Sequence, residues 1–159
     1  MQNLLLLLSI LLLPFSCHVS ANQKPSLLSR ELAGRWTDTT VYNDSSRVLI
    51  HELDLRRNGQ FTSKSFNYKG YRNGVPTELS AWSEDRGQVT QQADTLWFAL
   101  REETVWDSFY PGRKPQTKAT TGYLFNNCTF RLRGDTLELI HTSDDAPFYR
   151  STYTRLRSK

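Results

Sequence analysis

Two histidines lie in segments where an imidazole could reach the interior of a folded domain. His51 falls in RVLIHELDL and His141 in TLELIH, and apolar residues alternate with polar ones in both. Because successive side chains of a strand point to opposite faces, each histidine shares its face with leucines. Two inward imidazoles could hold a metal or a haem iron, but no spacing supplies the further ligands that such sites need. We therefore expect hydrogen-bonded core histidines, no metal site and no cofactor.

The other reactive residue types do not form a catalytic pattern. Cys128 lies on the apolar face of CTFRLR, where a cysteine usually serves as a small buried hydrophobe. Glu102 and Glu103 are adjacent, so a strand would point them to opposite faces and they could not act as a carboxylate pair. The chain has no serine elbow, no His-Glu-x-x-His and no phosphate-binding loop. We expect no enzymatic activity.

Aromatic residues are the better candidates for a binding site. Aromatic side chains that line a small barrel would bind a flat or apolar molecule, oriented by a few polar groups. The predicted ligand-binding residues are Phe98, Trp82, Trp106, Tyr123, Phe125 and His51. Phe98 has the strongest claim, because it follows the apolar face of TLWFALREE. The alternative for each aromatic residue is ordinary packing in the core.

The elements that must position these residues are short strands joined by turns. Apolar residues recur with a period of two in four clear segments: RVLIHELDL, TLWFALREE, CTFRLR and TLELIH. Asn58-Gly59 and Gly134-Asp135 predict hairpin turns. RNG at 72–74 and DRG at 85–87 predict further turns, and the segment 107–118, which is rich in Pro and Gly, predicts a long loop. This pattern predicts an all-β fold, an antiparallel up-and-down β-barrel of about eight or nine strands.

Gly34-Arg35-Trp36, preceded by Leu32, resembles the Gly-x-Trp signature that opens the first strand of lipocalins and lipocalin-like domains. The hairpin segments LDLRRNGQF and FRLRGDTLEL are similar in form, and the resemblance covers residues 32–156. In physical terms Gly34 lets the backbone bend, and Trp36 can close the base of the barrel as an apolar plug. The resemblance implies that an arginine from the last strand, here Arg155, packs over Trp36. It identifies the chain as a non-classical member, because the second motif and the disulfide of the family are not found.

The first residues predict export. The apolar run at 4–13 is shorter than the ~20 residues of a membrane span and ends before a small-residue cleavage site, Val19 to Ala21. We expect a signal peptide at 1–21, a linker at 22–31 and a barrel domain at 32–159, in a periplasmic or secreted protein. The alternative is a lipoprotein anchored through Cys17 in LPFSC.

These observations together predict a non-catalytic protein that binds a small hydrophobic or aromatic ligand in its barrel cavity. The alternative is a filled barrel whose loops, notably 107–118, bind a protein partner of the envelope or the secreted fraction. The formal net charge of +4 comes from basic residues spread among acidic ones, whereas a nucleic-acid partner favours a concentrated basic patch. We expect no nucleic-acid partner and no membrane span.

Overall fold

The structure is a computed structural model that describes residues 27–42, 46–109, 112, 114–122, 124, 128–143 and 146–157, with the backbone alone at 142, 143 and 146–149. These residues form strands and connecting turns. The strands are β1 (Gly34–Val41), β2 (Arg47–Leu55), β3 (Gln60–Arg72), β4 (Val75–Gln92), β5 (Thr95–Asp107), β6 (Gln116–Ala119), β7 (Cys128–Arg133), β8 (Thr136–Ser143) and β9 (Ala146–Arg155).

The strands close into the predicted barrel. Neighbours follow the order β4-β3-β2-β1-β9-β8-β7-β5-β6, and β4 also pairs with β5. All of these pairs are antiparallel, so β1–β5 and β7–β9 make a closed up-and-down barrel of eight strands, and β6 is an extra strand on β5. The expectation of an all-β barrel is confirmed.

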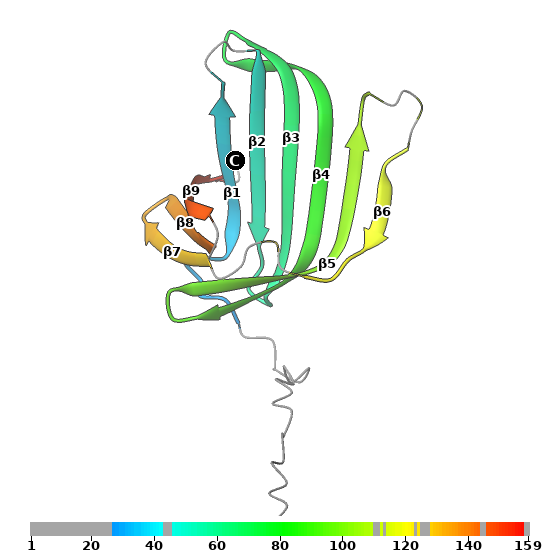
Figure 1. The fold of residues 1–159 in the computed structure, drawn as a ribbon. Coiled ribbons are helices and arrows are strands. Elements are labelled where there is room, and N and C mark those ends of the chain that lie inside the picture. Colours follow the sequence, from blue (N-terminus) through cyan, green and yellow to red (C-terminus); the bar gives the residue numbers. More distant parts are fainter. Residues whose placement is uncertain are drawn as a thin grey trace, which may run out of the picture.

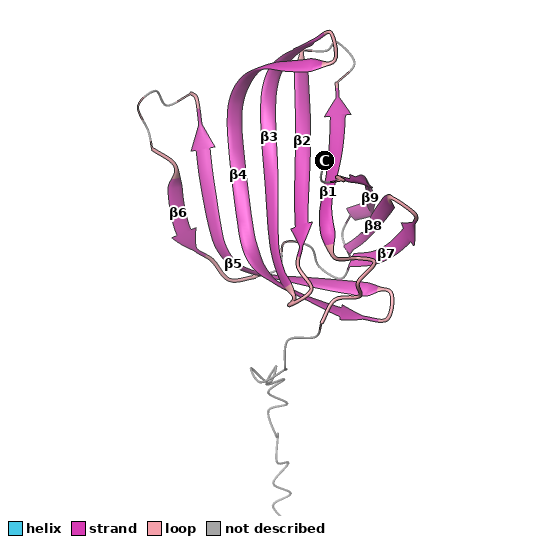
Figure 2. Cartoon of the chain, turned by 180° about the vertical axis from the view of Figure 1, so that it is seen from behind, coloured by secondary structure: helices cyan, strands magenta, loops and turns pink. Residues whose placement is uncertain are grey.

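Two short ladders close the barrel at one end. Between β1 and β9 only Trp36 and Thr37 have partners, and between β5 and β7 only Thr95 and Leu96 do. The ladders from β1 through β5 are much longer. Figures 1 and 2 show the result from two sides: β1–β6 stand next to one another, whereas β7–β9 gather at one end, where the β4–β5 hairpin bends toward them. The sheet therefore extends beyond the closed end.

The two faces of the β1–β5 sheet have different roles. One face, here called the core face, carries Trp36, Leu53, Phe61 and Phe98, which form a buried cluster with residues of β7–β9 such as Leu139. Alternate residues point to the opposite side, here called the outer face. Near the closed end, apolar residues at every second position thus bury the core face and leave the outer face for polar groups. Farther from the closed end the outer face also carries apolar residues, among them the buried Val48.

Most predicted turns are in place. Asn58-Gly59, Asn73-Gly74 and Gly134-Asp135 each connect two strands, and both Asn73 and Gly74 have the positive φ of a tight hairpin, 52° and 79°. The turn predicted at 85–87 is wrong, because these residues lie inside β4. Gly87 there accompanies a shift in register between β4 and β5. A β-bulge, rather than a reversal, explains this glycine.

The loop predicted at 107–118 is partly wrong, because Gln116–Ala119 form β6 on the edge of β5. Among the residues that the structure describes, no helix is long and apolar enough to cross a membrane. The predicted signal peptide at 1–21 and the anchor at Cys17 lie outside the described residues.

Candidate functional site

A row of polar side chains crosses the core face where the sheet extends beyond the closed end. Asp38 on β1 is directly opposite His51 on β2, and His51 is directly opposite Ser65 on β3. The Ser65 hydroxyl oxygen lies 2.9 Å from Nδ1 of His51, a hydrogen bond between partly buried groups. The predicted core histidine is therefore hydrogen-bonded and lies beside a carboxylate and a hydroxyl.

The surroundings of His51 favour its neutral form. Burial lowers the pKa of His51 below its ordinary value, and the charge of Asp38 only partly opposes this effect. A neutral imidazole has one nitrogen that donates and one that accepts. The His51–Ser65 pair can therefore offer both a donor and an acceptor to a bound molecule.

A carboxylate pair lies one row nearer the closed end. Asp85 on β4 is directly opposite Glu103 on β5, and both belong to the core face. Burial raises the pKa of Asp85, and the charge of Glu103 raises it further. Lys118 on β6 lies 2.8 Å from Glu103 and offsets part of this repulsion. The core face is therefore more polar here than a cavity for a purely apolar molecule would be.

The closed end beneath these rows is filled by side chains. The rings of Phe61 and Phe98 meet edge to face, with centroids 5.1 Å apart, and Phe98 has no exposed surface. Phe98 thus lies on the predicted inward face and packs in the core. Leu124 packs against the same cluster, and its N–H donates to the Phe98 carbonyl.

The structure does not bring the other predicted aromatic residues together with Phe98. Trp82 pairs with Trp106 and, on its other side, with Phe66, and this register places all three on the outer face. Trp82 and Trp106 are therefore separated from the core by the sheet itself. Tyr123 and Phe125 lie outside the described residues. Of the predicted ligand-binding residues, His51 alone is described on the polar part of the core face.

Sequence reasoning missed Asp38, Ser65 and Asp85. The signal for Ser65 was present, because Phe61, Ser63 and Ser65 alternate along one face of β3 in the segment QFTSKSF. A face that begins with a phenylalanine and continues with serines indicates a strand that leaves the core.

The outer face carries an open groove of about 820 Å³. Most of the residues that line it belong to β1–β5 and are charged or polar. The basic residues that line it are Arg35, Arg56, Lys64, Arg86 and Arg101, and the acidic ones are Glu52, Asp54, Glu84 and Glu102. Five positive charges against four negative ones leave the groove close to neutral.

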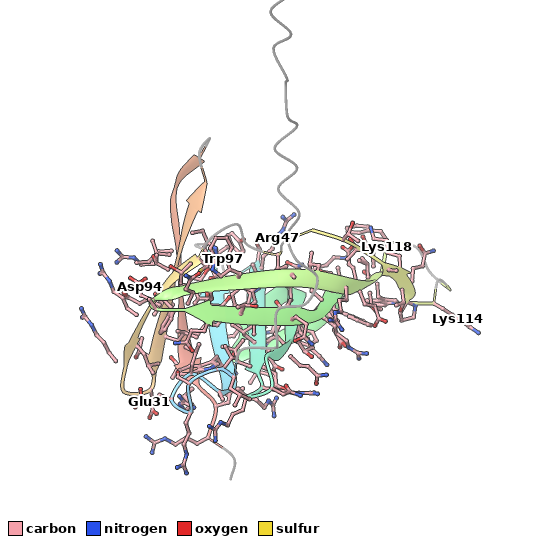
Figure 3. The ribbon with its side chains drawn as sticks, turned by 90° about the horizontal axis from the view of Figure 1, so that it is seen from below. Glu31, Arg47, Asp94, Trp97, Lys114 and Lys118 are labelled. Carbon is pink, nitrogen blue, oxygen red and sulfur yellow. The ribbon has the colours of Figure 1, made fainter. Side chains whose placement is uncertain are left out.

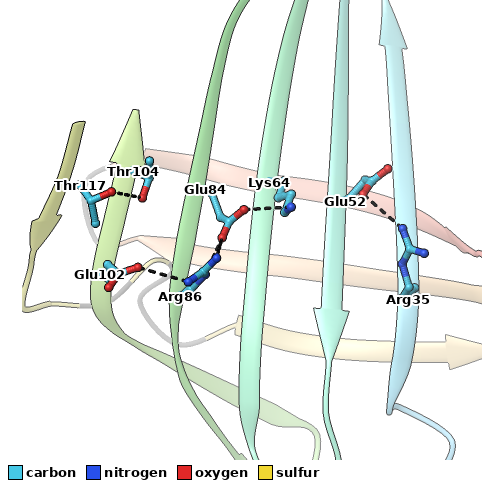
Figure 4. A network of polar contacts seen from close by, with 8 residues as sticks. All are labelled: Arg35, Glu52, Lys64, Glu84, Arg86, Glu102, Thr104 and Thr117. Atoms are coloured by element: carbon cyan, nitrogen blue, oxygen red, sulfur yellow. Dashed lines mark hydrogen bonds and ion pairs between the residues drawn. The ribbon is translucent and has the colours of Figure 1, made fainter. Parts of the chain in front are cut away.

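Ion pairs connect these side chains across adjacent strands, as Figure 4 shows. Lys64 Nζ lies 2.9 Å from Glu84, which also pairs with Arg86, and Arg86 continues to Glu102 at 3.5 Å. Burial alone would raise the pKa of Glu84, but the hydrogen bonds and charges of Lys64 and Arg86 outweigh it and lower that pKa. Glu84 is therefore held ionised in the middle of the network.

The Gly-x-Trp residues lie at the closed end. Trp36 is fully buried, and its indole N–H donates to the Leu32 carbonyl at 3.0 Å. The Arg155 guanidinium lies over the Trp36 ring, 4.1 Å from its centroid. Gly34, Trp36 and Arg155 are thus structural neighbours, as the family resemblance implies.

Within the described ranges, no group of three or more His, Cys, Asp and Glu side chains could hold a metal ion. No protein-family model matches the chain, and a search of curated proteins finds no match. Function is therefore inferred from the two faces of the sheet.

Proposed function

We propose that the protein is a non-catalytic, lipocalin-like binding protein, exported through its N-terminal segment, and that its small-molecule ligand binds on the core face of the extended sheet. The observation that carries this proposal is the hydrogen bond between His51 and Ser65, 2.9 Å long, on a partly buried part of that face. A bound molecule can exchange hydrogen bonds with this pair and remain shielded on the side of the closed end.

The ligand that fits is a small molecule with an apolar or aromatic body and one polar group. Leu49, Ala81 and Val105 share the core face with His51, and Val105 is 43% exposed. They can cover an apolar body, and its removal from water contributes about 25 cal/mol per Å². The polar group would bind to His51 and Ser65. A ligand seated inside the closed end, by contrast, would have to displace Phe98 and its neighbours.

Native mass spectrometry of the protein purified from its own host tests whether a small molecule co-purifies. The wild type should retain a bound molecule, which can then be identified and titrated back. His51→Ala and Ser65→Ala should each weaken binding about tenfold, the effect of one lost hydrogen bond to a partly buried group. Thr104→Ala, on the outer face of β5, is the matched control and should bind as the wild type does. Equal affinity in all four proteins would contradict the proposal.

A second candidate function is favoured by Phe109, in the connection from β5 to β6. Phe109 is 71% exposed, and Lys69 Nζ lies 4.8 Å from its ring centroid. Aromatic residues, Phe included, are enriched at protein interfaces, so this exposed ring could anchor a protein partner. In this alternative the filled barrel serves as a support, and its loops bind an envelope or secreted protein.

Phe109→Ser separates the two candidates. A protein partner identified by cross-linking to the wild type should be lost from the variant, while any small-molecule affinity stays unchanged. The opposite result would reject the loop as the binding surface.

A further inference from the structure

A row of large apolar side chains crosses four strands on the outer face. Ile50 on β2 is directly opposite Phe66 on β3, Phe66 is opposite Trp82 on β4, and Trp82 is opposite Trp106 on β5. Adjacent strands lie about 4.8 Å apart, so the three aromatic residues span about 10 Å of the sheet. We call Phe66, Trp82 and Trp106 the aromatic platform.

The aromatic platform is not part of the core. Its members are partly exposed, whereas the core residues Trp36 and Phe98 are completely buried on the opposite side of the sheet. In most antiparallel sheets with one face in water, the residues that point to that face are polar. Val48, in the next row of the same face, is 1% exposed, so side chains pack on one another here outside the core cluster. The three aromatic residues of the platform nevertheless keep exposed surface.

The platform borders the charged groove. The next row of the outer face consists of Glu52, Lys64, Glu84 and Thr104, each directly opposite its neighbour and each two residues along the strand from the platform row. The first three line the groove, and all four appear in Figure 4. Apolar ring faces and a dense array of hydrogen-bonding groups thus lie side by side on one surface.

The chemistry of the groove discriminates between classes of ligand. Four carboxylates among its walls would repel the phosphates of a nucleic acid, which favours a surface with concentrated positive charge. The centre of a protein–protein interface is depleted in Lys, Glu and Asp, and this surface is rich in them. A sugar hydroxyl both donates and accepts, so it can bind to guanidinium and carboxylate groups in the same groove.

We propose that the aromatic platform and the adjacent groove bind a neutral oligosaccharide chain. The C–H faces of its sugar rings pack on Trp82 and Trp106, because the electron-rich faces of aromatic rings attract C–H edges. Its hydroxyls bind to the array centred on Glu84 and Arg86, whose ion pairs fix the positions of the polar atoms. This site lies on the opposite face from His51 and is independent of the small-molecule function proposed above.

The test uses the full chain and linear oligomers of glucan, mannan, xylan and chitin, titrated by calorimetry. Sites are then mapped on the wild-type protein by oxidation of tryptophan with N-bromosuccinimide, with and without the oligomer, and peptide mass spectrometry. We expect one oligomer class to bind with weak dependence on salt and to protect Trp82 and Trp106. Trp97 provides the internal control: it lies near Asp94 at the β4–β5 turn, as Figure 3 shows, nine residues along β5 from Trp106, and it does not line the groove, so it should stay unprotected.

Substitution gives a second readout. Trp82→Ala should weaken binding of that oligomer about tenfold, while Trp97→Ala should leave it unchanged. Because the mapping uses the wild type, a variant that fails to fold does not obstruct the test. The proposal is overturned by no binding to any of the four oligomers, by binding without protection of Trp82 and Trp106, or by salt-sensitive binding to acidic polysaccharide or single-stranded DNA alone. Capture of a protein on this face in place of an oligomer would overturn it as well.

Discussion

Arg155, from the last strand, closes the end of the barrel over Trp36, from the first. Its guanidinium carbon lies 4.1 Å from the ring centroid, Nη1 donates to the Ala33 carbonyl at 3.0 Å, and Nη2 donates to the carbonyl of Glu31. A Cβ at Gly34 would come within 2.7 Å of Nη1. The glycine, the tryptophan and the arginine therefore form one structural unit that joins β1 to β9.

Arg155→Lys should lower the free energy of unfolding by about 1–3 kcal/mol. A lysine keeps the charge but loses the planar fork that binds two carbonyls and stacks on the ring. Urea denaturation measures the change. Arg157→Lys is the matched control, because its side chain is 81% exposed and pairs with Asp135 at the surface. That control should change stability by less than about 0.5 kcal/mol, and equal effects of the two substitutions would contradict the role of Arg155.

Gly87→Ala should destabilise the fold by more than about 3 kcal/mol, in the range of severe core defects. The added Cβ would lie 2.0 Å from the carbonyl oxygen of Ala99 and 2.8 Å from a ring carbon of Phe61. The first of these is backbone in the adjacent strand, so the β4–β5 ladder itself would have to shift. Thermal unfolding of the variant gives the measurement.

Gly74→Ala is the comparison for that experiment. Nothing lies within 4 Å of its added Cβ, but its φ of 79° is a conformation that side chains disfavour. It should cost about 1 kcal/mol. A Gly87→Ala protein as stable as Gly74→Ala would show that the backbones of β4 and β5 do not approach this closely at Gly87 and Ala99.

The fold could be predicted because each of its signals is local. Alternation in segments such as RVLIHELDL, and dipeptides such as Asn58-Gly59, are decided by a few neighbouring residues. Gly87 shows where this reasoning fails. A glycine between polar residues predicts a turn, but the same residue also permits close approach of two backbones inside a long strand, and that requirement arises from Ala99 on the next strand.

The candidate site could be predicted only in part, because the face of a strand is fixed by pairing. The leucine neighbours of His51 on one strand are enough to predict that it faces the core. Trp82 and Trp106, in contrast, fall on the outer face, which is revealed by their register with Phe66 and not by their own segments. The extension of β2–β5 beyond the closed end could not be predicted either. It depends on how far β1 pairs with β9 and β5 with β7, and β1 and β9 are far apart in the sequence.

The protein should lose stability as the pH falls from 7 to 5. Burial lowers the pKa of His51 and of His141 in the folded state, so below the ordinary value of 6.5 the unfolded chain binds protons that the folded chain does not. Stability rises with pH wherever the unfolded state binds more protons. Urea denaturation at both pH values should show a smaller difference for His51→Gln than for the wild type, and the smallest for the double variant with His141→Gln.

Glu84 and Asp85 also make stability depend on pH. The histidine variants are therefore needed to isolate the contribution of the two imidazoles between pH 5 and 7. The lowered pKa of Glu84 contributes stability above its ordinary value of 4.5, and this contribution is lost at lower pH. The raised pKa of Asp85 has the opposite sign, because ionisation of the folded carboxyl is disfavoured as the pH rises above 3.8. An unchanged pH dependence in the double histidine variant would show that neither imidazole is desolvated.

Cys128 should be almost unreactive in the native protein. The side chain is buried in the core cluster, and burial raises the pKa of its thiol to about 12. At pH 8 the thiol of native Cys128 is not ionised, and burial keeps the reagent away from its sulfur. Reaction therefore requires opening of the barrel. In a Cys17→Ser background, where Cys128 is the remaining cysteine, labelling by a disulfide reagent should be on the order of 5,000-fold slower than in denaturant, the factor for an opening of about 5 kcal/mol. Rapid labelling of the native chain would mean that β7 separates easily from β5, where two residue pairs join them, and that the barrel opens at this seam.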